Sequence, residues 1–465
     1  MRQDRVTPWL ASLVLHAVLL VILGLAVFGR NGIGSGVGLI VSTEQPFPQP
    51  VRPEASDRHV PVRLDANLNP RPLSITQEQA PDMSSLQEKF DPSRAGQTRE
   101  VLHGTPQVRV SLGGGLEGRQ ADRRARLARE GGGNGASEAA VARGLRWLMA
   151  HQLDDGSWRF DFRQAPQCRG QCGDHGSIGS STAATALALL PFLGAGFTHT
   201  GGEYQQLMRR GIYYLSGREQ VTPQGGDLQE GTMYAQGLAT LALCEAYAMT
   251  EDNSLRPFAR SALDFILHAQ HKEGGWRYVP GQPGDTTVTG WQVMALKSGQ
   301  LAGFDIPQPT WYAVSHFLDG VAGDGGSYYG YLRPEPRPTT TAIGLLCRMY
   351  LGWPRRYGAL ERGVERLAEL GPSSNDMYFN YYASQVMHHY QGRFWKRWNP
   401  VMRQMLVDRQ ATEGHETGSW QFSEPHSREA GRLYNTAMAI MTLEVYYRYL
   451  PLYGERAVGR APYGE

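Results

Sequence analysis

Three carboxylates lie near the starts of apolar helical segments, where acid–base chemistry could be arranged. They are Asp285 in the stretch "QPGDTT", Asp376 and Glu416. Two carboxyl groups that face each other across roughly 5–9.5 Å can cleave a glycosidic bond, and one protonated carboxyl can act as a general acid. The alternative is that they cap helices, with Asp285 accepting from the amides of Thr287 and Val288. The sequence leaves both interpretations open.

Aromatic and polar side chains gather in the same segments. If these segments converge at one end of the molecule, their side chains form a polar, aromatic-lined pocket. Aromatic faces stabilise cations and stack on sugars or isoprenoids, so such a pocket would suit a hydrophobic or isoprenoid ligand. The alternative is that the rings simply fill the core. The candidate cavity residues are Trp291, Tyr378, Tyr381, Tyr382, His389, Tyr434 and Asn435.

Cysteine and histidine gather in the segment "CRGQCGDHG". The spacing of Cys168, Cys172 and His175 loosely resembles that of a metal site, with Asp174 or Asp161 as a fourth ligand. Outside the cytoplasm the two cysteines could instead form a short disulfide, and free thiols are the third alternative. Three ligands in one loop do not define a zinc site, so we predict neither a bound metal nor another cofactor.

The chain from residue 136 onward repeats a two-helix unit. First helices carry an aromatic–aliphatic pair such as Trp147–Leu148 or Phe265–Ile266. The second helices are expected to begin near Thr182, Thr232, Thr286, Thr339, Met377 and Leu433. A hairpin cannot bury its apolar face alone, so the units must stack. Six hairpins can close into a ring with the apolar second helices inside, and we therefore predict an all-α domain over residues 136–455.

Glutamine, glycine and tryptophan recur after the first helices, as in "RGLRWLMAHQLDDGSW" and "ALDFILHAQHKEGGW". The positions are Gln152, Gly156 and Trp158; Gln270, Gly274 and Trp276; and, around an insertion, Gln410, Gly418 and Trp420. This pattern resembles the QW motif of squalene cyclases, and more broadly the terpenoid cyclases and protein prenyltransferases. The resemblance implies an (α/α)6 toroid with a central cavity. The motif is architectural, because its glutamine can satisfy free amides at a helix start and its tryptophan can cover the turn.

The acid motif of those cyclases is not preserved. The resemblance implies an Asp-x-Asp-Asp motif at the start of an inner helix, whose middle Asp protonates an alkene. In the matching window Gln282 replaces the first Asp, Gly284 stands in the acid position, and Asp285 remains. The ordinary pKa of Asp is about 3.9, so keeping Asp285 protonated at neutral pH would cost about 4 kcal/mol. The motif offers no neighbouring carboxylate to supply that shift.

The N-terminal segment differs in character from the rest of the chain. Residues 8–28 are apolar apart from Ser12 and His16, and a helix of that length rises roughly 30 Å, enough to cross a bilayer. We predict a transmembrane anchor over residues 1–29 in a single-pass membrane protein, with the ring on the non-cytoplasmic side. The anchor resembles that of TonB-type energy transducers, which implies a TonB-like partner that contacts Ser12 and His16.

Composition narrows the choice of function. Residues 30–135 are Pro-, Gly- and Arg-rich and are expected to form a disordered linker, and residues 456–465 a flexible tail. The net charge of +2 excludes a nucleic-acid partner, because it leaves no face-sized positive patch. We favour a membrane-tethered binding or scaffolding module, or an enzyme of unknown activity. The alternatives are a cyclase-like enzyme acting on isoprenoid lipids and a glycan-processing enzyme on the same ring.

Overall fold

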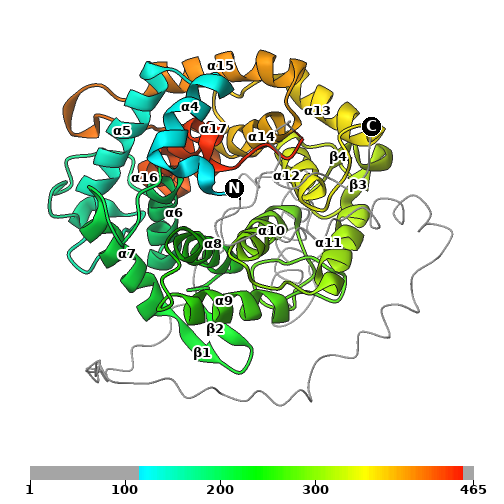
Figure 1. The fold of residues 1–465 in the computed structure, drawn as a ribbon, viewed down its shortest axis with the longest axis horizontal. Coiled ribbons are helices and arrows are strands. Elements are labelled where there is room, and N and C mark those ends of the chain that lie inside the picture. Colours follow the sequence, from blue (N-terminus) through cyan, green and yellow to red (C-terminus); the bar gives the residue numbers. More distant parts are fainter. Residues whose placement is uncertain (1–114, 454–465) are drawn as a thin grey trace, which may run out of the picture. The chain divides into compact units, whose positions relative to one another are not determined.

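The computed structural model describes residues 115–453, which form a ring of helices (Figure 1). The inner layer comprises α6 (Ser181–Gly194), α8 (Met233–Thr250), α10 (Thr286–Leu301), α12 (Pro338–Tyr350), α14 (Met377–Tyr390) and α16 (Pro425–Leu443). The outer layer comprises α5 (Gly135–Ala150), α7 (Gln205–Arg218), α9 (Arg256–His268), α11 (Gln308–Val321), α13 (Gly358–Leu370) and α15 (Arg393–Arg409). Each inner helix packs against the next and α16 packs against α6, so the ring closes.

The two layers differ in how they bury their side chains. Every residue of α6 is buried, as expected for a small, apolar helix that has partners on all sides. Outer helix α13 buries one stripe, which includes Leu360, Val364 and Leu367 at positions i, i+4 and i+7. The hydrophobic core therefore lies between the layers and within the inner ring.

The helix starts agree with the sequence pattern, with two local differences. The first five inner helices begin within a residue of their predicted positions. Helix α16 starts at Pro425, yet Gly431 within it has φ 71°, so the regular helix resumes near the predicted Leu433. The second difference is in α5, whose N-cap is Asn134; Ser137, which its residue type would also suit to a cap, is instead the third residue of the helix. The two form a reciprocal capping box, in which Ser137 N donates to Asn134 Oδ1 at 2.9 Å.

Two short sheets correct the all-α prediction in detail. Strand β1 (Gln220–Thr222) pairs with β2 (Gly225–Asp227), and β3 (Ala322–Gly323) pairs with β4 (Tyr328–Tyr329), both antiparallel. Both sheets lie in connections from an outer to an inner helix. Pro223 and Gln224 form the turn between β1 and β2, and a turn that contains Gly325 and Gly326 joins β3 to β4. The strands are too short to form a separate layer.

Three Gln–Gly–Trp joints link successive outer helices. In the first, Gln152 Nε2 donates to Gly156 O at 2.9 Å and to Leu207 O, near the start of α7, at 3.0 Å. In the second joint, the side chain of Gln270 donates to the carbonyls of Gly274 and Thr310. In the third, the side chain of Gln410 donates to the carbonyls of Gly418 and Ala140. Because Ala140 belongs to α5, the last joint ties the end of the ring to its beginning. The side-chain amides donate to carbonyl groups, whereas the motif had suggested that they satisfy free helix amides.

Glycine and tryptophan are both required by the close packing at each joint. Gly274 has φ 94°, and a Cβ atom there would lie 1.7 Å from Ala313 O on α11. Trp276 is buried; its Nε1 donates to Ile266 O at 2.8 Å and its main-chain N to Thr289 Oγ1 at 3.0 Å. Trp158 makes the same two bonds, from Nε1 to Leu148 O and from N to Thr185 Oγ1. Trp420 makes them to Leu406 O and Thr436 Oγ1. Each joint therefore locks an outer helix, an inner helix and the next outer helix together.

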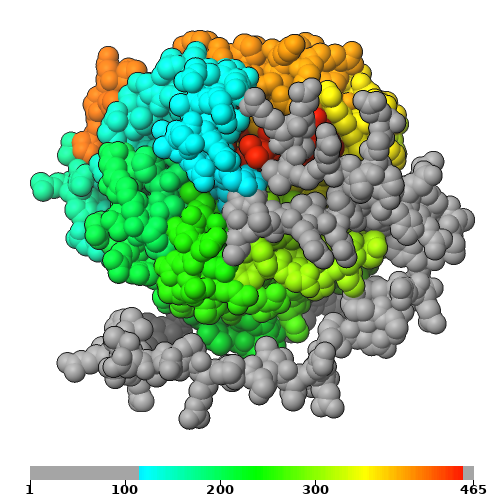
Figure 2. Space-filling view, viewed as in Figure 1, coloured from blue at the N-terminus to red at the C-terminus, as the bar shows by residue number. Residues whose placement is uncertain are grey.

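Residues 115–135 belong to the ring domain, although the sequence pattern placed them in the linker over 30–135. The turn η1 (Glu117–Arg119) precedes α4 (Ala121–Gly131), which packs on α17 (Val445–Arg448). Trp395 Nε1 of α15 donates to Gly131 O at 2.9 Å. Figure 2 shows the first and last described residues, in cyan and red, side by side near the centre of one face. The linker prediction was wrong here because an arginine-rich run does not reveal a buried partner.

A buried ionic cluster joins these two ends of the described chain. It consists of Glu245, Arg119, Arg448 and Tyr449, and we call it the Glu245 cluster. The two Nη atoms of Arg119 donate to the two carboxylate oxygens of Glu245, each at 2.9 Å, and Arg448 Nη2 donates at 3.1 Å. Tyr449 OH donates at 2.6 Å. Burial alone would raise the pKa of Glu245, but Arg119 and Arg448 lower it to about 2, so the carboxylate is ionised.

Several predictions concern segments that the structure does not describe. The proposed anchor over residues 8–28, with Ser12 and His16, lies outside residues 115–453, as do the tail over 456–465 and most of the linker. Within residues 115–453, none of the helices combines the length and the hydrophobicity that a bilayer crossing requires.

Candidate functional site

Asp285 is the N-cap of α10. Its Oδ1 accepts hydrogen bonds from Thr287 N at 2.9 Å, from Thr287 Oγ1 at 2.7 Å and from Val288 N at 2.8 Å. These amides are the ones that the capping interpretation named. Asp285 N in turn donates to Trp276 O at 2.9 Å, so the cap is connected to the second Gln–Gly–Trp joint. The position is set by local helix chemistry, and this explains why an aspartate is suited to it.

The second oxygen of Asp285 lies in a different environment. The side chain is fully buried, and Oδ2 lies 3.8 Å from Arg277 Nε. Burial raises the pKa of Asp285, and the hydrogen bonds to Oδ1 together with the charge of Arg277 only partly oppose this shift. Asp285 in the folded protein therefore keeps its proton to a higher pH than an aspartate exposed to water does. This shift arises although the neighbouring carboxylates of the cyclase motif are missing.

The other two candidate acids are also engaged in structural contacts. Asp376 is the N-cap of α14, where it accepts from Phe379 N at 2.8 Å and from Thr339 Oγ1 at 3.0 Å. Glu416 lies in the turn η4 (Gly414–Glu416), where it accepts from Gly173 N at 2.8 Å and pairs with Arg432 at 2.9 Å. The two carboxylates thus hold a helix start and a loop contact in separate parts of the ring, and neither contact is with Asp285.

Four half-buried tyrosines surround the start of α10, and we call them the tyrosine collar: Tyr234, Tyr278, Tyr331 and Tyr378. The hydroxyls of Tyr278 and Tyr331 are 2.8 Å apart, and Tyr234 OH donates to Thr287 Oγ1 at 2.8 Å. The guanidinium of Arg277 lies over the rings of Tyr278 and Tyr331, at 5.5 and 5.9 Å from their centroids. The collar therefore combines aromatic faces, hydroxyls and one cation near the buried Asp285.

Sequence reasoning identified only Tyr378 of the collar. A repeat signal was nevertheless available, because Tyr278 follows Trp276 by two positions and Tyr331 follows Tyr329 by two. Tyr329 occupies the tryptophan position of its unit, since its main-chain N donates to Thr341 Oγ1 as Trp276 N does to Thr289. This offset locates two of the four collar residues, but Phe160 and Phe422 follow Trp158 and Trp420 at the same offset and are buried outside the collar.

The predicted cavity aromatics do meet, but they fill the ring. Trp291 Nε1 donates to Tyr378 OH at 2.8 Å, and the Trp291 ring stacks on Tyr381 with centroids 5.8 Å apart. Tyr382 packs edge-on against Trp291, and Tyr434 is buried as well. At this end, the interior is therefore occupied by the protein's own side chains.

Two predicted cavity residues lie outside this aromatic cluster. Asn435 Nδ2 donates to Gly431 O at 2.9 Å and to Ser427 O at 3.1 Å, so it braces the kink in α16. His389 lines a cavity of about 90 Å³ together with Lys297 and Gly115, next to the Glu245 cluster. Burial lowers the pKa of His389 to about 3, so its imidazole is neutral. The cavity has room for a few water molecules and is much smaller than a drug-sized ligand pocket of about 300–1,000 Å³.

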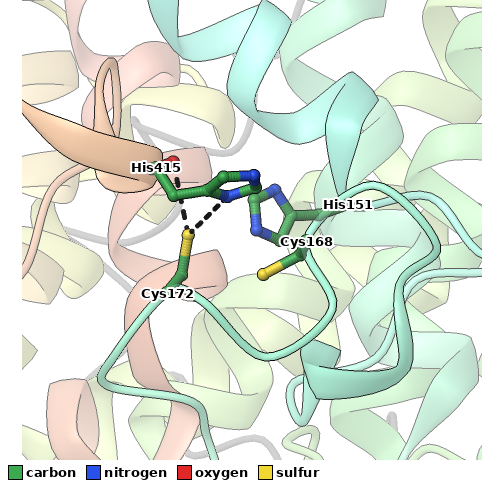
Figure 3. Close-up of side chains that lie close together, drawn as sticks. All are labelled: His151, Cys168, Cys172 and His415. Atoms are coloured by element: carbon green, nitrogen blue, oxygen red, sulfur yellow. Dashed lines mark hydrogen bonds between the residues drawn. The ribbon is translucent and has the colours of Figure 1, made fainter.

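The cysteines of the "CRGQCGDHG" loop are buried, free thiols, so the disulfide alternative is not realised in the structure. His175, the predicted third ligand, is exposed and lies outside their cluster. Instead His151 and His415 lie beside Cys168 and Cys172 (Figure 3). Of the proposed fourth ligands, Asp161 pairs with Arg163 at 2.6 Å and Asp174 with Arg432 at 2.5 Å.

Substitution of Asp285 separates capping from acid chemistry. Asp285→Ala should destabilise the protein by about 0.5–2 kcal/mol, because three hydrogen bonds to the first turn are lost. Asp285→Asn should cost less, because asparagine caps about as well as aspartate. Urea unfolding of both variants measures the difference. Equal destabilisation by the two changes would show that the charge or the proton, rather than the cap, is what matters.

Comparisons with known proteins leave the family open. No protein-family model matches the chain, and no curated protein matches it. Similar solved structures include an inactive variant of an alpha-1,6-mannanase from Salegentibacter sp., at 10% identity and TM-score 0.48, covering 68% of this chain and 99% of that one. A type II terpene cyclase from Scytonema matches at 11% identity and TM-score 0.46, covering 67% of this chain and 97% of that one. A cellobiose 2-epimerase from Bacillus thermoamylovorans matches at 10% identity and TM-score 0.48, covering 69% of this chain and 99% of that one. At this level of similarity the matches carry no argument about activity.

Proposed function

We propose that the ring is a non-catalytic binding module that takes its ligand at the tyrosine collar. The observation that carries this proposal is the collar itself, four half-buried tyrosines at the end of the ring where buried side chains fill the interior. Half-buried aromatic faces are available for stacking at modest ordering cost. Arg277, which lies beside Asp285 and over two of the rings, adds a cationic contact.

The collar favours a ligand with a flat apolar face and attached polar groups. Both sugars and the head regions of isoprenoid lipids have this chemistry, since each can stack on an aromatic ring while accepting hydrogen bonds from phenols. The small size of the cavity at the opposite end argues against deep insertion of a whole isoprenoid chain without rearrangement. We therefore place recognition at the rim of the ring.

The proposal includes tethering at a membrane. A helix over residues 8–28 would anchor the chain, with the ring on the non-cytoplasmic side, and Ser12 and His16 would share the helix face that contacts a TonB-like partner. A ligand at a cell envelope, either glycan or lipid, would then be within reach of the collar.

Binding by the collar is tested with the full-length protein in detergent. Co-purified lipids are identified by mass spectrometry, and binding to a panel of soluble glycans is measured by calorimetry. Tyr331→Ala should weaken binding of the identified ligand up to about tenfold, because one stacking contact is worth roughly 0.5–1.5 kcal/mol. Tyr213→Ala is the matched control, since Tyr213 is 47% exposed on outer helix α7. Equal affinity of the two variants would contradict the proposal.

A cyclase-like enzyme acting on isoprenoids is the second candidate. It is favoured by one observation: burial raises the pKa of Asp285, and the Asp285 carboxyl lies near enough to Tyr378, which is hydrogen-bonded to Trp291, to act on its charge. Incubation of the protein with linear isoprenoid lipids, followed by mass spectrometry, distinguishes the candidates. Cyclised product that disappears in Asp285→Asn would replace the binding proposal with this one.

A further inference from the structure

Two histidines and two cysteines, residue types that can ligate a metal ion, meet where the first hairpin packs against the sixth. His151 ends α5, Cys168 and Cys172 lie in the connection from α5 to α6, and His415 lies in the turn η4 between α15 and α16. One ligand atom of each residue lies within 4.8 Å of all the others (Figure 3). We propose that these four residues bind one zinc ion, which fastens the two ends of the ring together.

The geometry is close to that of a tetrahedral site. With Zn–S distances of about 2.3 Å and Zn–N distances of about 2.0–2.1 Å, neighbouring ligand atoms in a tetrahedron are roughly 3.3–3.8 Å apart. Cys172 Sγ and His415 Nδ1 are already 3.4 Å apart. The remaining pairs lie within 4.8 Å of one another, so they need to close by roughly 1–1.5 Å at most, which side-chain rotation supplies.

His151 is oriented as a metal ligand. Its Nδ1 lies 2.6 Å from Trp147 O, a carbonyl that can only accept, so Nδ1 carries the proton and Nε2 keeps its lone pair. The ring is held between Trp147, stacked at 3.7 Å, and Phe162, which packs edge-on. Nε2 is buried and has no hydrogen-bond partner among residues 115–453. A histidine whose other nitrogen is fixed by a backbone carbonyl is the usual arrangement at metal centres.

The loops that carry the ligands are held together independently of the four side chains. Arg432 pairs with Glu416 at 2.9 Å and donates to Gly173 O at 3.2 Å, and Glu416 accepts from Gly173 N. Further along the cysteine loop, Ser177 N donates to Glu429 O of α16 at 2.8 Å. The site is therefore positioned by contacts between the two hairpins, and a metal would add to an interface that already exists.

The ligand set favours zinc. Two thiolates and two imidazoles in a tetrahedral arrangement are typical of structural zinc sites, and the two thiolate charges balance that of Zn²⁺. Since the protein supplies all four ligands, no position is left for water or substrate, so the metal would stabilise the fold and not act as a Lewis acid. This proposal does not depend on the ligand-binding proposal above, because the tyrosine collar and the cysteine loop involve different residues.

Metal content of the full-length protein tests the site. Protein expressed with added zinc and purified without chelator should carry about one zinc ion per chain by elemental mass spectrometry. Cys168→Ser and His415→Ala should each lose most of it. His175→Ala and Cys244→Ser are matched controls and should keep it, since His175 is exposed and Cys244 is buried in α8.

Cobalt substitution guards against variants that fail to fold. Wild-type protein reconstituted with Co²⁺ should show the visible absorption of tetrahedral cobalt and a thiolate-to-cobalt charge-transfer band. Three results would overturn the proposal. These are wild-type protein without bound metal, equal metal content in Cys168→Ser and His175→Ala, or a Cys168–Cys172 disulfide in peptides digested without reduction.

Discussion

Glu245→Gln should destabilise the ring by about 3–5 kcal/mol, the range for breaking a buried ion pair by removing one partner. The substitution preserves size and removes the only charge that Arg119 and Arg448 share within the Glu245 cluster. Both guanidiniums are almost completely buried, so they cannot recover the lost interaction from water. The stability of the ring should therefore depend heavily on this one carboxylate.

Urea unfolding of the full-length protein, followed by circular dichroism, measures this change. Glu273→Gln is the control, because its side chain is 65% exposed and its removal should change stability by less than about 0.5 kcal/mol. A loss below about 1 kcal/mol in Glu245→Gln would mean that neighbouring groups, such as Glu444, neutralise the arginines instead.

The difference in stability between wild type and Glu245→Gln should depend on pH. The pKa of Glu245 in the fold, about 2, lies below the ordinary value of 4.5. Its stabilising contribution is therefore complete above pH 4.5 and is lost as the pH falls toward 2. Burial raises the pKa of Glu444, so that residue acts in the opposite direction, favouring the fold at low pH. The difference in stability between wild type and Glu245→Gln should accordingly shrink between pH 4.5 and 2.

Trp276→Ala should have a comparable effect, again about 3–5 kcal/mol. The indole is buried at the second Gln–Gly–Trp joint, so truncation leaves a cavity between α9, α10 and α11 and removes the hydrogen bond to Ile266 O. Loss of the joint should also loosen Asp285, whose main-chain N is bound to Trp276 O.

Trp276→Phe separates volume from hydrogen bonding. It retains most of the ring but leaves the buried Ile266 carbonyl unsatisfied, and it should cost about 1–3 kcal/mol. Thermal and urea unfolding of both variants, with Tyr312→Ala as an exposed control on α11, give the comparison. If Trp276→Ala and Tyr312→Ala unfolded at the same urea concentration, the joint would not be a stabilising element.

The ring was predictable because repeats place the same physical requirement at regular positions. Apolar second helices, turn glycines and joint tryptophans each recur, so one unit supports the interpretation of the next. Residues 115–135 were missed because a single segment has no repeat to compare with. The partner of Arg119 is Glu245, 126 positions away, and local charge patterns contain no trace of it.

The candidate site was predictable only where it is local. The capping geometry of Asp285 involves the next three residues, and the sequence indicated it correctly. The cysteine pair was found, but the third ligand was sought nearby at His175, whereas His415 lies 243 positions from Cys172. The collar combines residues of inner helices α8 and α14 with residues of the connections that precede α10 and α12. No single repeat unit contains all four tyrosines, so the pattern within one unit does not predict that they meet.

Closure of the ring has a consequence for how the chain folds during synthesis. The seam joins residues far apart in sequence: Arg143 to Gln410 across 267 positions and Arg119 to Arg448 across 329. On the ribosome these contacts cannot form until the sixth hairpin has emerged. Until then, the surface of the first hairpin that packs against the sixth stays exposed to solvent. Long-range closure of this kind slows folding and prolongs exposure of apolar surface. The protein should therefore depend on chaperones for the interval before its two ends meet.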